Sequence, residues 1–213
     1  MDNNANFVIE KRVQRTIENL EKNNIEGFYV KSEEELIKKI TEIVKEGSTV
    51  SVGGSMTLFE TGVINHLRSG RYNFLDRYKE GLSTDDLKDI FRKSFFADAY
   101  FTSSNAITEE GEIYNVDGNG NRVAAMIYGP DKVIIIAGIN KIVRDLDEAI
   151  IRNREMSAPA NAKRLNKNTP CTKTGYCMDC SSPDRICRNY VLIKNQGKKG
   201  RMFVIFVDKQ LGY

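Results

Sequence analysis

Short apolar runs along the chain alternate with longer segments in which apolar residues recur every three or four positions. The short runs predict β-strands, at residues 27–30, 49–52, 72–76, 99–102, 113–116, 132–137, 190–193 and 203–207. The segments with helical spacing predict helices, at residues 5–22, 32–47, 55–67, 83–95, 122–128 and 145–156. Such an alternation is typical of an α/β fold, in which helices flank a mostly parallel sheet.

Parallel sheets bind their ligands at the carboxyl ends of the strands, so the loops that follow strands are the first candidates for a site. The predicted strands that end at Val52, Thr102 and Ala137 each open into such a loop. After Thr102, a polar segment, a turn at 109–111 and a returning strand predict a β-hairpin.

The segment Gly53-Gly54-Ser55-Met56-Thr57 stands between a predicted strand and a predicted helix. Glycine lets the backbone approach an anion, Ser55 and Thr57 add hydroxyl donors, and a helix N-terminus offers unpaired N–H groups. A phosphate or a carboxylate is one natural occupant, and a tight turn in which Ser55 caps the helix is the alternative. The segment has neither a Walker sequence nor a dinucleotide-binding fingerprint.

Polar residues near this segment and around the hairpin supply further candidates. Glu60 is a candidate general base or covalent nucleophile, or else a solvent-facing residue favoured by the helix dipole. The two polar loops beside the hairpin predict a sugar or phosphate pocket with Arg122 as an anion clamp, or else are local turns. The candidate ligand-binding residues are Gly53, Gly54, Ser55, Thr57, Ser104, Asn105, Gly118, Asn119, Asn121 and Arg122.

All four cysteines lie within 17 residues, at Cys171, Cys177, Cys180 and Cys187. The Cys177–Cys180 pair has the chelating C-x2-C spacing, and four thiolates can hold Zn²⁺ or anchor an iron–sulfur cluster. The spacing does not separate the two metals. Free thiols or labile redox pairs are the alternative.

Composition and charge exclude several classes of protein. A net charge of +3, with Lys and Arg spread along the chain, does not indicate nucleic-acid binding. No apolar run approaches the roughly 20 residues that span a bilayer, and the N-terminal residues lack a signal-peptide pattern. We expect one cytoplasmic domain over residues 1–213, with a Cys-rich metal-binding loop at about 157–189 and no structural disulfides.

Together these segments resemble the lactate-utilisation (LUD) domain family in its short single-domain form. The resemblance depends on the Cys-rich segment and on VGGSMTLFETG (52–62), TSSNAITEEG (102–111), NVDGNGNRV (115–123) and PANAKRL (159–165). It implies the Rossmann-like fold of the NagB/RpiA-like superfamily of phosphosugar isomerases and CoA transferases. That superfamily places an anionic ligand beside a loop like Gly53–Thr57.

The resemblance implies a metabolic protein that binds a small anionic metabolite or cofactor. Such a protein would support the oxidation of lactate or another organic acid together with iron–sulfur oxidoreductase partners. The resemblance favours an iron–sulfur cluster over structural zinc at the cysteines, and superfamily analogy makes a homodimer plausible.

The same residues are consistent with two other functions. One is a stand-alone sugar-phosphate isomerase or CoA-transferase-like enzyme, with Glu60 or Asp117 as the acid–base group. The other is a non-enzymatic redox or metal-responsive sensor that uses the cysteines. A complete flavin or nicotinamide site is not visible in the sequence, which argues against a lactate dehydrogenase made of this chain alone.

Overall fold

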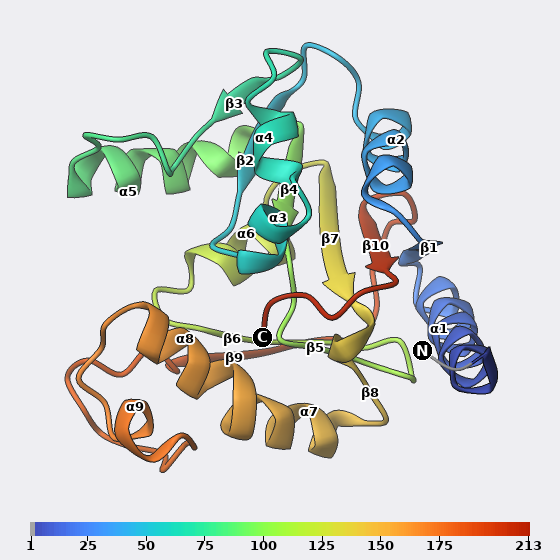
Figure 1. Ribbon diagram of the computed structural model, residues 1–213. Coiled ribbons are helices and arrows are strands. Elements are labelled where there is room, and N and C mark those ends of the chain that lie inside the picture. The colour runs from blue at the N-terminus through green and yellow to red at the C-terminus, as the bar shows by residue number, and fades with distance from the viewer. Residues whose placement is uncertain (1–2) are drawn as a thin grey trace.

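Six parallel strands form the central sheet in the computed structural model, which describes residues 3–213 (Figure 1). The predicted α/β class with a mostly parallel sheet is therefore confirmed. β7 and β10 lie inside the sheet, where apolar side chains are buried on both faces. The strand order is β1 (Glu26–Val30), β10 (Met202–Val207), β7 (Lys132–Gly138), β4 (Ala99–Thr102), β2 (Thr49–Val52) and β3 (Asn73–Leu75).

Helices cover both faces of this sheet, because successive strand residues point alternately into two apolar cores. Phe101 and Ile134 belong to one core, whereas Tyr100 and Ile135 belong to the other. The helices of the first core are α2 (Glu33–Ile43), α3 (Met56–Glu60) and α4 (Val63–Leu67), and those of the second are α1 (Asn3–Lys22) and α6 (Asn121–Tyr128).

A second sheet lies beyond the carboxyl end of β7 (Figure 1). Its order is β8 (Ile142–Val143), β5 (Ala106–Thr108), β6 (Ile113–Asp117) and β9 (Asn189–Ile193). The antiparallel β5–β6 pair confirms the predicted hairpin. Residues 103–105 separate β4 from β5, so the chain leaves the central sheet before the hairpin begins.

The helix predicted over residues 55–67 is wrong as a single element. The structure divides it into α3 and α4, because Gly62 adopts a left-handed conformation with φ of 68°. The part that follows the glycine loop therefore has only five residues. A helix this short has a small dipole, so its N-terminus attracts an anion only weakly.

The helix predicted to end at Met156 instead continues, through a π-helical turn, into a further helix. Pro159 lies in the first turn of that further helix, where a missing N–H costs little. The segment expected to be a Cys-rich loop from about residue 157 therefore begins as a helix. The three parts are α7 (Leu146–Arg152), the π turn (Asn153–Ser157) and α8 (Ala158–Arg164).

The remaining helical elements are short. Ser83 and Asp86 form a capping box at the start of α5. In the part of the chain that the structure describes, no helix is long and apolar enough to cross a membrane. The short elements are α5 (Thr84–Lys93), α9 (Cys171–Thr174) and 3₁₀ turns at Ser94–Phe96 and Ile139–Lys141.

The turn between β5 and β6 packs so closely against α1 that Gly111 has no room for a side chain. A Cβ there would lie 2.5 Å from Asn19 C and 2.6 Å from Leu20 N, and φ is +80°. We predict that Gly111→Ala lowers the free energy of unfolding by about 3 kcal/mol, from backbone strain plus overpacking. Urea unfolding measures this loss.

Gly47→Ala is the matched control, since Gly47 has φ of +79° but a Cβ at this position would have nothing within 4 Å. Its expected loss is about 1 kcal/mol, from backbone strain alone. Equal losses in the two variants would contradict the close contact between the turn and α1.

Candidate functional site

A cavity of about 420 Å³ lies at the carboxyl ends of the central strands. Four loops contribute to its wall: Gly54–Thr57 after β2, Ser103–Asn105 after β4, Lys141 after β7 and Gly212 after β10. These four strands are neighbours in the sheet. The three strand-end loops singled out in the sequence therefore do meet around one cavity.

Most of the predicted ligand-binding residues line this cavity. Gly53 does not, because it packs under Arg122: a Cβ would lie 2.9 Å from Arg122 Cγ and 2.9 Å from Thr102 Oγ1. Its role in the structure is to let the loop approach that side chain. Ligand binding by the others stays a prediction. Those that line the cavity are Gly54, Ser55, Thr57, Ser104, Asn105, Gly118, Asn119, Asn121 and Arg122.

The two predicted catalytic carboxylates lie in different places. Asp117 is among the residues that line the cavity, whereas Glu60 is not. Glu60 is exposed, and its Oε2 accepts a hydrogen bond from Gly212 N at 2.6 Å. The carboxylate of Glu60 therefore holds the segment 211–213 against α3.

Two of the serines make the local hydrogen bonds that the alternative interpretation expected. Ser55 caps α3 by accepting from Leu58 N at 3.4 Å. Ser104 Oγ lies 2.8 Å from Ala106 O and 2.9 Å from Tyr114 O. Because a hydroxyl that accepts can still donate its own hydrogen, the Ser55 hydroxyl remains a donor for the cavity.

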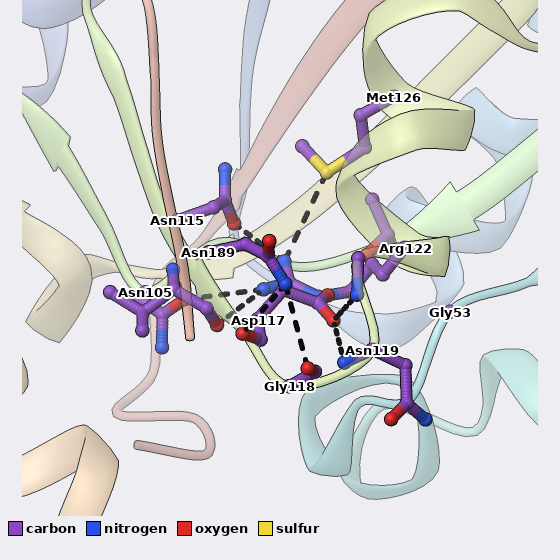
Figure 2. Close-up of polar contacts among 12 residues, drawn as sticks. Gly53, Asn105, Asn115, Asp117, Gly118, Asn119, Arg122, Met126 and Asn189 are labelled. Carbon is purple, nitrogen blue, oxygen red and sulfur yellow. Dashed lines mark hydrogen bonds and ion pairs between the residues drawn. The ribbon is translucent and has the colours of Figure 1, made fainter. Parts of the chain in front are cut away.

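Asp117 organises the loop between β6 and α6 (Figure 2). Its Oδ1 accepts from Asn119 N at 3.1 Å and Gly120 N at 2.9 Å, and its Oδ2 accepts from Arg122 Nε at 3.1 Å. These three bonds tie the loop and Arg122 to one carboxylate. Because the three bonds use both carboxylate oxygens, Asp117 stabilises this loop in addition to lining the cavity.

The guanidinium of Arg122 donates its hydrogen bonds to acceptors within the protein. Nη1 donates to Asn115 Oδ1 at 2.5 Å, and Nη2 donates to Val116 O at 3.0 Å and to Asn105 Oδ1 at 3.3 Å (Figure 2). With Asp117 on Nε, the guanidinium is surrounded by acceptors of the protein. An anion clamp formed by this side chain would have to break some of these bonds.

Lys141 is a site residue that the sequence analysis missed. Only 3% of it is exposed, and Nζ donates to Thr57 Oγ1 at 3.2 Å and to Ser103 Oγ at 3.0 Å. Burial lowers the pKa of this amine to about 7, with smaller contributions from Arg152 and Arg122, against an upward contribution from Glu60. The available signal was its position three residues after the end of β7, one of the strands whose loops were expected to form a site.

Positive charge dominates the cavity wall. The wall contains seven Lys or Arg side chains and two Asp side chains. Arg122 pairs with Asp117, and Arg185 pairs with Asp179. Within residues 3–213, the other five form no salt bridge, and the cavity therefore attracts anions. These five are Arg77, Lys141, Arg164, Lys167 and Arg188.

The four cysteines line one small, separate cavity of about 20 Å³. Cys187 belongs to the walls of both cavities, and burial, with a smaller effect of Cys177, raises the pKa of its thiol to about 11. Arg185 holds the segment together by donating to Cys180 O and Cys187 O, both at 2.6 Å.

Four thiols around one cavity have the donor chemistry that Zn²⁺ or an iron–sulfur cluster requires, so the residues fit the expected metal in kind. Among residues 3–213, however, no three Cys, His, Asp or Glu side chains are arranged to hold a metal ion. Metal binding would require the thiols to rearrange, and it stays a prediction.

Three solved structures are similar to this chain to different degrees. A DUF162 family protein from Deinococcus radiodurans is 17% identical, with a TM-score of 0.52 over 93% of this chain and 96% of that chain, which supports the fold. The eIF2B delta structure from Chaetomium thermophilum is 19% identical, with a TM-score of 0.36 over 56% of this chain and 50% of that chain. The malonate decarboxylase alpha subunit from Acinetobacter baumannii is 11% identical, with a TM-score of 0.40 over 95% of this chain and 38% of that chain.

The family of this chain follows from the match of its sequence to a family model. No curated protein matches the sequence. The family model of the LUD domain matches residues 13–207, which is most of the chain. This range contains the central sheet, the hairpin and all four cysteines. The resemblance seen in the sequence is thereby confirmed, and the chain belongs to the LUD domain family.

Proposed function

We propose that this LUD domain protein binds a small anionic metabolite or cofactor in the cavity at the carboxyl ends of β2, β4, β7 and β10. The observation that carries the proposal is Lys141, a buried amine without a carboxylate partner among residues 3–213. An unpaired buried cation costs stability unless something compensates its charge. Partial loss of the proton offsets some of this cost, and a bound phosphate or carboxylate would offset the rest.

The size and charge of the cavity support the same proposal. Its volume of about 420 Å³ lies within the range of roughly 300–1,000 Å³ that small-molecule sites occupy. A cavity of this volume has more room than a three-carbon acid alone needs. The unpaired cations of the wall would suit a ligand with several negative charges, such as a phosphorylated metabolite or a CoA ester.

The family membership extends the proposal to a pathway. We propose that the protein supports the oxidation of lactate or another organic acid, as a subunit that works with iron–sulfur oxidoreductase partners. A stand-alone isomerase or transferase that depends on Glu60 is less well supported, because that carboxylate is outside the cavity wall and bonded to Gly212 N.

We also propose that Cys171, Cys177, Cys180 and Cys187 hold an iron–sulfur cluster, with structural zinc as the alternative. Their common cavity supports this proposal. An iron–sulfur cluster would supply one-electron chemistry, and zinc would stabilise the segment. In either case the four thiols would bind as thiolates.

Ligand binding predicts a rise in melting temperature, because a ligand that binds only the folded state stabilises it. The probes are phosphate, ribose 5-phosphate, acetyl-CoA, pyruvate and lactate. We expect the multiply charged probes to raise the melting temperature most. Lys141→Met should weaken their binding by about 10- to 100-fold, the worth of a charged hydrogen bond.

The unliganded Lys141→Met protein should melt above the wild type, because the variant no longer buries an unpaired charge. Lys38→Met, on the exposed side of α2, is the control and should bind as the wild type does. If no probe moves the melting temperature of the wild type, the anion site is refuted.

Metal analysis of anaerobically purified protein tests the cysteine proposal. We predict stoichiometric iron and sulfide with visible absorbance, and loss of both when Cys177 and Cys180 are replaced by Ser. Zinc in place of iron would select the alternative. Protein without either metal, after purification and after reconstitution with each, would contradict metal binding.

A further inference from the structure

We propose that Lys141 acts as an amine nucleophile that forms an imine with an anionic ligand carrying a ketone or aldehyde group. The inference rests on the proposed anion site and narrows its ligand class to carbonyl compounds such as 2-oxo acids and sugar phosphates. Its basis is the arrangement of the amine with two hydroxyls at the wall of a cavity rich in cations.

Among residues 3–213, no carboxylate forms a salt bridge that would fix Lys141 as an ammonium ion. Its two hydrogen-bond partners, Thr57 and Ser103, are neutral. The pKa of about 7 leaves half of the amine neutral at pH 7, whereas an ordinary lysine with a pKa near 10.4 is neutral in about one molecule in 2,500. A neutral amine is the form that attacks a carbonyl carbon.

The charged groups that face Lys141 come from three other elements. Arg122 on α6 is paired with Asp117, and Arg152 on α7 donates to Asn140 O and Asn105 O. Both guanidiniums disfavour a further positive charge, and Glu60 on α3 opposes them with a smaller effect. These cations therefore favour both the neutral amine and the bound anion.

Gly212 leaves space beside the amine. Gly212 lines the same cavity, and a Cβ there would lie 2.7 Å from Thr57 Oγ1 and 3.5 Å from Lys141 Nζ. A side chain at this position would crowd the nucleophile. Two hydrogen bonds hold residues 211–212 in place. Gly212 N donates to Glu60 Oε2, and Leu211 N donates to Asn140 Oδ1 at 3.0 Å.

The step is balanced without an oxidant or a reductant. The lone pair of Nζ attacks the carbonyl carbon, and the carbonyl oxygen takes up a proton to give a carbinolamine. Loss of water then leaves a C=N bond to Lys141. Ser103 and Thr57, which contact Nζ, are placed to pass the proton from nitrogen to oxygen.

Reductive trapping tests the proposal. The protein is incubated separately with pyruvate, glyoxylate and ribose 5-phosphate in the presence of cyanoborohydride, and intact mass and peptide mapping locate the adduct. We expect a single saturable adduct on Lys141 with at least one probe. At pH 7 the trapping rate at Lys141 should exceed that of surface lysines by about a thousand-fold, in proportion to the neutral amine.

The pH profile separates Lys141 from other amines. At sub-saturating probe concentrations the rate reports the unliganded amine, so trapping should increase about tenfold per pH unit below pH 7 and level off above it. Trapping of surface lysines should continue to increase up to about pH 10. Lys141→Arg keeps the cation but cannot form the imine, so the adduct should disappear, and Lys38→Met should be trapped like the wild type. Peptide mapping of the adduct in the wild-type protein locates the reactive lysine even if the Lys141→Arg variant does not fold.

Two negative results overturn different claims. If anions raise the melting temperature but none of the three probes gives an adduct on Lys141, the imine is refuted and the anion site stands. If neither effect occurs, both are refuted. Adducts spread over many lysines and unchanged in Lys141→Arg also refute the imine.

Discussion

The burial of Lys141, which has no carboxylate partner among residues 3–213, is the constraint on which the rest of the site depends. Its amine donates to two hydroxyls, and its low pKa expresses the cost of burial as a lower affinity for protons. In the unfolded protein this amine has a pKa near 10.4. Burial of the amine therefore lowers the free energy of unfolding by its full amount below about pH 7, and this loss vanishes as the pH rises towards about 10. A bound anion offsets the cost at neutral pH, and this links ligand binding to stability.

The other charged groups of the site hold its walls in place. Arg122 and Asp117 bond to each other and to the loop between β6 and α6, and Arg152 bonds to carbonyl oxygens and to Ser157 Oγ. These hydrogen bonds hold Arg122, Asp117 and Arg152 in place without a ligand, and groups that are already ordered lower the entropy cost of binding. The wall cations that form no salt bridge within residues 3–213 remain available to a ligand. They are Lys141, Arg77, Arg164, Lys167 and Arg188.

Much of this fold could be predicted from the sequence, because strands and caps are local patterns. The strand ends at Val52 and Thr102 also located the cavity, since parallel strands bring their loops to one edge. Two features required contacts between distant segments. Lys141 is buried only because loops after three other strands surround it, and Glu60 meets Gly212, which lies 152 positions further along the chain. No local pattern reports such a contact.

The most direct test of this account is the pKa of Lys141, measured by NMR titration of protein with ¹³C-labelled lysine and assigned with Lys141→Arg. We predict one lysine that titrates near pH 7, and a rise in its pKa when a bound anion compensates the charge. A Lys141 amine that titrates near the ordinary value of about 10.4 would contradict the central claim.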